Sequence, residues 1–333
     1  MEAERPEKRQ RTDEGPPDAV RSDIWFDDGN IILQAGGYQF RVYRGLLARH
    51  SPVFKDMFAI PQPSGNSSPA AQTDDCPIIH LADSADDVHF MLTKLYNISD
   101  TEDDRRQALN ISDLIASLRM GHKYLIARLW NDPVNRLRRA FPADHDLLMD
   151  CLKEDNDISS SRCATEIRIP SSENLLQLVH VIEQVGLQTV LPALYYRIIL
   201  RETLDSIIVG GFGLSDRARA ALLGGRARLS NSVASVLRTW GRLEPHATSV
   251  NSQCWKARYD YVLDNASGRL PIGPWTENLS PDMCLQCRTQ LSMALTLMRS
   301  KAWAELPTVF GLPPWADLHD FDIWTYTHFT IKA

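Results

Sequence analysis

The chain has 333 residues, of which 44% are hydrophobic and 23% are charged, and its formal net charge is −6. This composition is typical of a folded globular protein of about two domains. The acidic balance argues against a general nucleic-acid or anionic-membrane binder. No apolar run approaches the ~18 residues of a membrane span, and the N-terminus lacks the apolar region of a signal peptide. We therefore expect an intracellular protein of the nucleus or cytoplasm.

The first 20 residues are charged, contain several prolines and have almost no large apolar side chains, which predicts a disordered tail. Its basic cluster, Lys8–Arg11, is either a short nuclear localisation signal interrupted by Gln10 or simply part of a solvated tail. The six cysteines of the chain are mostly scattered, so their spacing does not predict a secreted disulfide framework.

Order is expected from about Asp23, where DIWF leads into two strand-like segments, NIILQA and YQFRVY, joined by Gly36-Gly37. Two glycines between such segments predict a tight hairpin, because both positions can adopt positive φ. In the second strand Tyr38, Phe40 and Val42 share one face, which we expect to be the core face.

After this hairpin the hydrophobic period changes from that of a strand to that of a helix. RGLLARH predicts two helical turns, and Ser51 followed by Pro52 predicts the cap and first turn of a second short helix. Beyond a Pro/Ser/Gly-rich loop, PIIHLA predicts a strand and Ser84 predicts the cap of a longer helix. The apolar stripe of that helix is Val88, Met91, Leu92, Leu95 and Tyr96.

From about Asp146 onward the patterns are helical throughout, with helix starts predicted at Pro192, Ser230 and Ser280-Pro281. One stretch of this half is basic and carries Arg217, Arg219, Arg226 and Arg228. It is either a solvated helix and turn or a surface that contacts phosphate. The acidic balance of the whole chain favours the solvated helix and turn. Near the chain end a packed aromatic unit is predicted from Trp303, Leu306, Pro307, Phe310, Pro313 and Trp315.

The order and identity of these residues resemble a BTB/POZ domain, from SDIWFDDGNIILQAGGYQFRVYRGLLARHSPVFKDMF through PIIHLADSADDVHFMLTKLY to SLRMGHKYLIARL. The later stretch CLQC…W…LPTVFGLPPWADL is similar to the C-terminal region of a set of fungal BTB/POZ domain-containing proteins. The resemblance implies an α+β fold: a BTB/POZ domain over residues 21–145, with a small sheet and a helical bundle, followed by a mostly α-helical domain over residues 146–333.

The resemblance also implies a non-catalytic protein-interaction module that forms a homodimer through the BTB domain. One implied role is that of a substrate adaptor that binds a cullin-type ubiquitin ligase. The alternative is a nuclear transcriptional cofactor or scaffold that binds no cullin. The implied site residues are Asp23 and Arg44, which match a charged pair near the family's dimer centre, and Phe90 and Lys94, which lie off the apolar stripe of the helix that faces cullins.

A metal site is a separate hypothesis of the second half. Cys284-x-x-Cys287 places two thiols at a spacing that zinc can use, and Cys254 or His246 upstream could complete a tetrahedral set. The other interpretation is that these are small buried cysteines on a helix face, which are common without metal. Neither a redox CxxC site nor a glycine-rich phosphate loop is predicted from the flanking residues.

Overall fold

A computed structural model describes residues 19–60, 72–73, 76–96, 107–154, 166–168, 172–209, 213–243, 252–272 and 279–323. The chain divides into two compact units, Met1–Ile98 and Ser99–Ala333. The basic cluster Lys8–Arg11 lies outside the described residues, as does most of the predicted tail. Val20, placed in that tail from the sequence, already belongs to the first strand.

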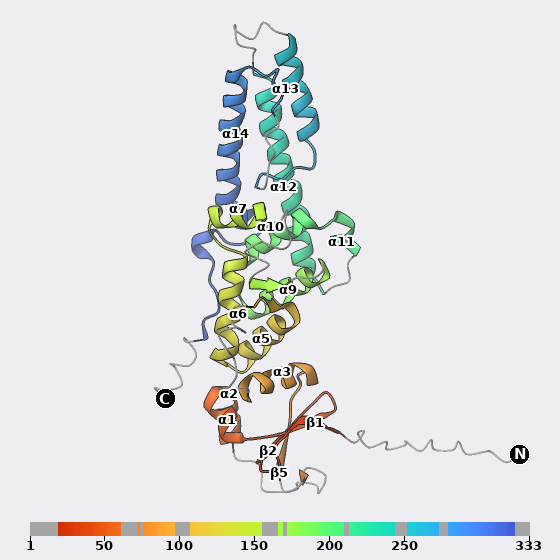
Figure 1. Ribbon diagram of the computed structural model, residues 1–333, viewed down its shortest axis with the longest axis vertical. Coiled ribbons are helices and arrows are strands. Elements are labelled where there is room, and N and C mark those ends of the chain that lie inside the picture. Colours follow the sequence, from red (N-terminus) through yellow and green to blue (C-terminus); the bar gives the residue numbers. More distant parts are fainter. Residues whose placement is uncertain are drawn as a thin grey trace, which may run out of the picture. The chain divides into compact units, whose positions relative to one another are not determined.

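The first unit contains a small mixed sheet and three helices (Figure 1). The strands are β1 (Val20–Trp25), β2 (Ile31–Ala35), β3 (Tyr38–Val42), β4 (Gln72–Thr73) and β5 (Cys76–His80). Their order is β1-β3-β2-β5-β4, which places β2 in the centre and β1 at one end. The β2–β3 pair is antiparallel, whereas β1–β3 and β2–β5 are parallel.

The glycine-linked hairpin and its core face are confirmed. Gly36 and Gly37 have φ of +52° and +82°, the left-handed conformation that a tight turn requires and that a Cβ would strain. Phe40 and Val42 are buried, while Tyr38 at the turn end of the strand is 46% exposed. The central strand β2 is almost wholly buried, as expected for a strand covered on both faces.

The helices of this unit are α1 (Arg44–His50), α2 (Pro52–Ala59) and α3 (Ala85–Tyr96). The predicted Ser51 cap is present, because the Phe54 N–H donates to Ser51 Oγ at 3.1 Å. Ser84 caps α3 in the same way, accepting the Asp87 N–H at 3.1 Å. The buried face of α3, made by Val88, Met91, Leu92 and Leu95, packs beside β1 and β2.

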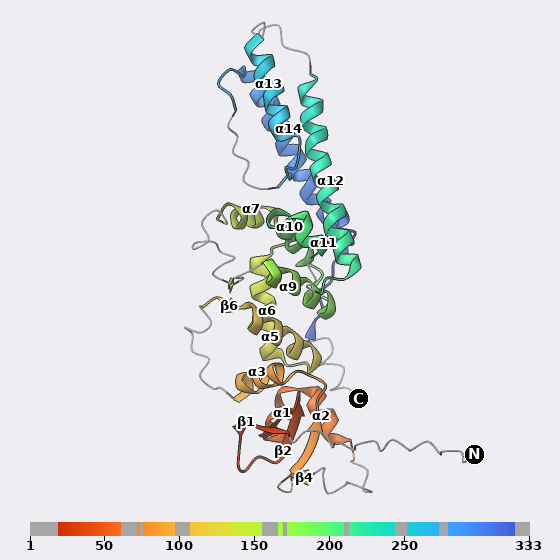
Figure 2. The same cartoon turned by 90° about the vertical axis from the view of Figure 1, so that its right-hand side faces the viewer.

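The second unit is mainly helical. Its helices are α5 (Ile111–Lys123), α6 (Ala127–Ala140), α7 (His145–Glu154), α9 (Ser172–Val185), α10 (Leu191–Arg201), α11 (Leu204–Val209), α12 (Asp216–Gly241), α13 (Ser252–Asn265), α14 (Leu285–Ala304) and α15 (Leu306–Val309), with the short strands β6 (Leu109–Asn110) and β7 (Ile167–Arg168). Helices α12, α13 and α14 lie side by side in both views (Figures 1 and 2).

The two compact units divide at Ile98/Ser99 and not near residue 145, where the sequence places the boundary. The units divide there because α5 and α6 pack into the larger hydrophobic core of the helical unit. Leu118 and Leu137 belong to the same buried cluster as Ile182 and Leu194 of α9 and α10. The fold class is therefore α+β with a small mixed sheet, but these two helices group with the helical unit. None of the described helices is long and apolar enough to cross a membrane.

Two predicted helix starts are wrong. Ser230 lies inside α12, a single helix of 26 residues that begins after Ser215, whose Oγ accepts the Ala218 N–H at 3.0 Å. The helix expected at Ser280-Pro281 begins at Leu285, with Cys284 as its N-cap. The earlier Ser280 instead makes a local turn, in which its Oγ accepts the Asp282 N–H. The start at Pro192 is confirmed in the first turn of α10.

The predicted aromatic unit near the chain end is packed, except that Pro313 is exposed. The rings of Trp303 and Trp315 are 4.8 Å apart, and the Trp315 indole N–H donates to the Trp303 carbonyl at 2.9 Å. Phe310 is 2% exposed and packs edge-on against Tyr195 of α10. Its ring also lies against Gly225 of α12, where an added Cβ would be 2.4 Å from a ring carbon. A glycine is therefore required where Phe310 meets α12.

Replacing Gly225 by alanine tests this close approach. We expect Gly225→Ala to lower the free energy of unfolding by about 1–2 kcal/mol, because the overpacking penalty exceeds the ~1 kcal/mol that alanine contributes to a helix interior. Gly224→Ala is the matched control, since the nearest atoms to its Cβ would be the guanidinium nitrogens of Arg228 at 3.2 Å. Urea denaturation should show the control to be neutral or more stable; equal behaviour of both variants would contradict the packing.

Candidate functional site

The two predicted dimer-interface residues, Asp23 and Arg44, interact with different partners within the chain. Asp23 in β1 is largely exposed and accepts a hydrogen bond from His89 of α3 at 2.9 Å. Hydrogen bonds from Ser22 and His89 lower the pKa of this carboxyl group. Arg44 at the start of α1 packs its guanidinium over the Phe58 ring and donates to the Phe58 carbonyl. The two charges are exposed and are not paired with each other in one chain.

The two predicted partner-binding residues, Phe90 and Lys94, are neighbours on α3. Both are half-buried, and the Lys94 ammonium lies 5.9 Å from the centroid of the Phe90 ring. They lie off the buried face of Val88, Met91 and Leu95, as the helical period predicts. The pair presents an apolar ring beside a positive charge.

Three of the four predicted metal-ligating residues come together in the second unit. The Sγ atoms of Cys254, Cys284 and Cys287 all lie within 4.8 Å of one another. Cys254 is in the first turn of α13, Cys284 caps α14 and Cys287 is in its first turn. Cys254 and Cys287 are buried, whereas Cys284 is half-buried. The fourth predicted ligand, His246, lies outside the described residues.

The three thiols differ in acidity because their surroundings differ. The backbone N–H of Cys287 faces the Cys284 sulfur at the start of α14 and lowers the pKa of Cys284. Burial raises the pKa of Cys287 to about 12. Cys254 Sγ lies 3.8 Å from Cys287 Sγ and accepts the Cys284 N–H at 3.4 Å. The pKa of the Cys284 thiol is therefore lower than that of the Cys287 thiol.

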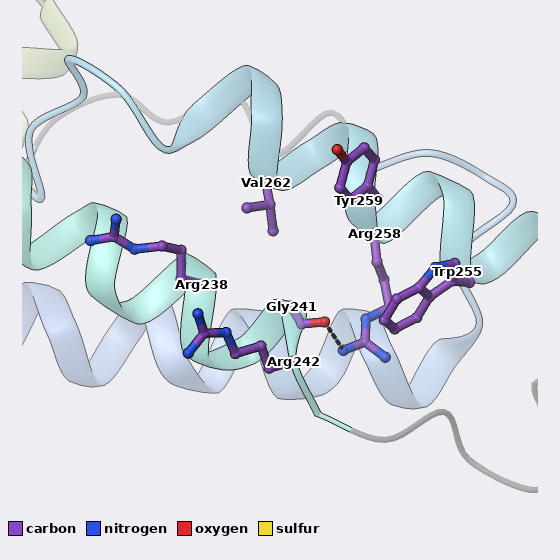
Figure 3. A pocket seen from close by; sticks show the side chains of 7 residues that line it. All are labelled: Arg238, Gly241, Arg242, Trp255, Arg258, Tyr259 and Val262. Carbon is purple, nitrogen blue, oxygen red and sulfur yellow. Dashed lines mark hydrogen bonds between the residues drawn. The ribbon is translucent and has the colours of Figure 1, made fainter.

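A pocket of about 240 Å³ opens between the end of α12 and the outer face of α13 (Figure 3). Trp255, Tyr259 and Val262 come from α13, at the spacing of one helical face. Arg238 and Arg242 reach the pocket from α12, and both are exposed. Among the described residues neither guanidinium has an acidic partner. The pocket thus combines an apolar aromatic wall with two free positive charges.

Arg258 forms the floor of this pocket and closes the end of α12. Its side chain is 2% exposed, and its guanidinium donates to the carbonyls of Trp240, Gly241 and Leu243 at 2.6, 3.2 and 2.9 Å. The cation also lies 5.1 Å from the ring centroid of Trp240 and 5.5 Å from that of Trp255, of which Figure 3 draws Trp255. A helix end leaves its last carbonyls without partners, so a buried cation here stabilises α12 and orients Trp255.

The basic stretch of α12 serves packing instead of forming a phosphate surface. Arg226 donates to the carbonyls of Ile199 and Glu202, and Arg228 donates to the Val309 carbonyl. Arg219 pairs with Asp216 one turn earlier. The stretch expected to be a helix and a turn is therefore continuous helix. Arg226 and Arg228 bind neighbouring segments to α12, whereas the Arg219 pair lies within the helix.

The pocket residues were not singled out from the sequence. One signal was present: in WKARYDYV the residues Trp255, Arg258, Tyr259 and Val262 recur at i, i+3, i+4 and i+7, which predicts a single helical face. Nothing local shows that this face lies beside Arg238 and Arg242, because those residues belong to a different helix. Comparison of the chain with protein-family models, with curated proteins and with solved structures gave no match.

Loss of the buried cation should weaken the helical unit. We expect Arg258→Met to reduce the free energy of unfolding by about 2–3 kcal/mol, because three carbonyls lose a charged donor. Arg238→Met changes the same chemical group at an exposed position and should lie within about 0.5 kcal/mol of wild type. Urea unfolding followed by tryptophan fluorescence measures both; equal, small effects would show that Arg258 does not hold the end of α12.

Proposed function

We propose that the protein is a non-catalytic protein-interaction module whose N-terminal unit self-associates and whose helical unit recognises a partner. The order of elements in the first unit supports the resemblance to a BTB/POZ domain: the Gly36-Gly37 hairpin is followed by α1, by α2 with its Ser51 cap, by β5 and by α3. Domains of that kind associate with copies of themselves and with other proteins. The resemblance to such domains is the reason to propose self-association. The position of β1 in the sheet indicates which surface would take part.

The observation that carries the proposal is the position of β1 at one end of the sheet. The strand is largely exposed, with Val20 at 57%, and it pairs only with β3. A strand at an edge presents backbone N–H and C=O groups to which another strand can bind. Asp23 projects from this same strand, so the predicted dimer residue lies on the surface proposed for self-association.

The backbone of β1 pairs with β3 on one side of the strand. The Val20 N–H donates to the Gly37 carbonyl of β3 at 2.9 Å. The Val20 side chain is 57% exposed at the start of this strand. A charged side chain at this position would oppose an incoming strand while the backbone bond to β3 stays in place.

Val20→Lys should therefore weaken self-association by about tenfold, because a lysine on an edge strand disfavours the approach of a second strand. Val20→Thr is the matched control, since it keeps the β-branched shape and adds no charge. Sedimentation equilibrium of the full chain gives both dissociation constants. A monomeric wild-type chain, or equal effects of both variants, would contradict association through this edge.

The helical unit offers a second surface suited to a partner protein. Tryptophan, tyrosine and arginine are the residues most enriched at interface hot spots, and the pocket of Trp255, Tyr259, Arg238 and Arg242 contains all three. Two arginines without acidic partners among the described residues favour a partner segment that carries carboxylates. We assign this pocket to the recognition of such a segment.

A cullin-type ubiquitin ligase is the partner that we propose for α3. Phe90 supplies an apolar anchor beside the Lys94 charge, the kind of pair that a helix of another protein can cover. In the alternative role, that of a nuclear transcriptional cofactor or scaffold, the chain would self-associate without binding a cullin. The Lys8–Arg11 cluster that motivates this alternative lies outside the described residues.

The adaptor role predicts that a cullin copurifies with the tagged protein from its native cells and that Phe90→Ala reduces its recovery at least tenfold, through the loss of a buried aromatic anchor. Tyr38→Ala is the control, because Tyr38 is an exposed aromatic residue elsewhere in the unit. Quantitative mass spectrometry of the purified complexes measures the recovery. Self-association without any cullin would exclude the adaptor role and favour the scaffold.

A further inference from the structure

The three cysteines at the start of α13 and α14 form the densest group of potential metal ligands in the described part of the chain. Cys254 and Cys287 are separated by 33 residues in sequence, yet their sulfur atoms lie 3.8 Å apart. Cys284 completes the group, with all three sulfur atoms within 4.8 Å of one another. The fold, and not merely the Cys284-x-x-Cys287 spacing, brings the third thiol into place.

The separation of these sulfur atoms fits a tetrahedral metal site. Sulfur ligands about 2.3 Å from a zinc ion lie about 3.8 Å from one another when the geometry is tetrahedral. The Cys254–Cys287 distance equals that value, and Cys284 needs to move by less than about 1 Å to reach it. Three thiolates and no oxygen ligand are a donor set that zinc prefers over magnesium or calcium.

The surroundings of the cluster also favour metal-bound thiolates. A backbone N–H faces the sulfur of Cys284, and the Cys284 N–H donates to the sulfur of Cys254. Such bonds stabilise negative sulfur and orient metal ligands. Cys254 and Cys287 are both buried, so a metal bound between them would be shielded from water. Cys284 is half-buried, which leaves a route for the ion to enter.

We propose that Cys254, Cys284 and Cys287 bind one Zn²⁺ ion that joins the first turn of α13 to the start of α14. The ion takes its fourth ligand from solvent, at the half-buried side of the cluster beside Cys284. Because Trp255 follows Cys254 directly, the metal also holds one wall of the arginine and aromatic pocket in position. This site does not depend on the proposed interaction function.

The test is zinc content together with cobalt spectroscopy on the full chain. Wild-type protein purified under reducing conditions should contain about one zinc ion per chain by elemental mass spectrometry. After chelation, added Co²⁺ should give the charge-transfer absorption of thiolate ligands and the visible bands of a tetrahedral site. Cys254→Ser and Cys287→Ser should each reduce zinc content at least fivefold. Cys76→Ser, a buried cysteine of the other unit, should retain it.

The cobalt titration keeps the proposal falsifiable even when a serine variant fails to fold, since it uses the wild-type chain. Folded wild-type protein that contains no zinc and gives no thiolate-to-cobalt band would overturn the proposal. A disulfide between Cys254 and Cys287 in freshly purified protein would also overturn it. Full zinc retention in both serine variants would place the ion elsewhere.

Discussion

The helical unit depends on the continuity of α12, a single helix that contributes to both of the described hydrophobic cores of this unit. Helix α14 also reaches both cores, through Ala302 in the larger one. The first half of α12 buries Leu222 and Leu229 in the larger core, and its second half buries Val233 and Leu237 in the smaller one. Gly225 allows the continuity, because its missing Cβ leaves room for Phe310 from the end of the chain.

The C-terminal end of α12 contributes both to the packing of the helices and to the pocket that we propose binds a partner. Arg258 neutralises the last carbonyls of the helix and holds Trp255 over the pocket, so the same buried cation stabilises the bundle and shapes its surface. Cys254 of the cysteine cluster precedes Trp255 directly, so the proposed zinc ion would join α13 to α14 beside the same pocket. A pocket wall held in place in this way would lower the entropic cost of binding a partner.

Local signals in the sequence predicted much of the first unit. Gly36-Gly37, Ser51-Pro52 and Ser84 each determine a turn or a cap through their own backbone chemistry, and each was placed correctly. The same reasoning failed at Ser230, because a serine can cap a helix or lie within one. Its helical context is set by contacts of α12 with segments far away in the sequence, which no local pattern contains.

For the candidate sites too, the sequence predicted the residue chemistry but not the contacts between distant segments. Grouping Cys254 with Cys284 and Cys287 was possible from chemistry alone, since few residue types bind zinc, but their proximity depends on how α13 packs beside α14. The pocket was missed because its arginines and its aromatic wall come from different helices. The compact units divide at Ile98/Ser99 instead of near residue 145, because α5 and α6 share a hydrophobic core with α9 and α10.

Hydrogen exchange of the full chain at increasing concentration is the most direct test of self-association through β1. The backbone amides of β1 should exchange more slowly as concentration rises, because a second copy covers the outer edge of the strand. Amides of the central strand β2 should keep the same rates and serve as the internal reference. Exchange in β1 that stays constant while the chain forms dimers would contradict the proposed edge and move the interface elsewhere.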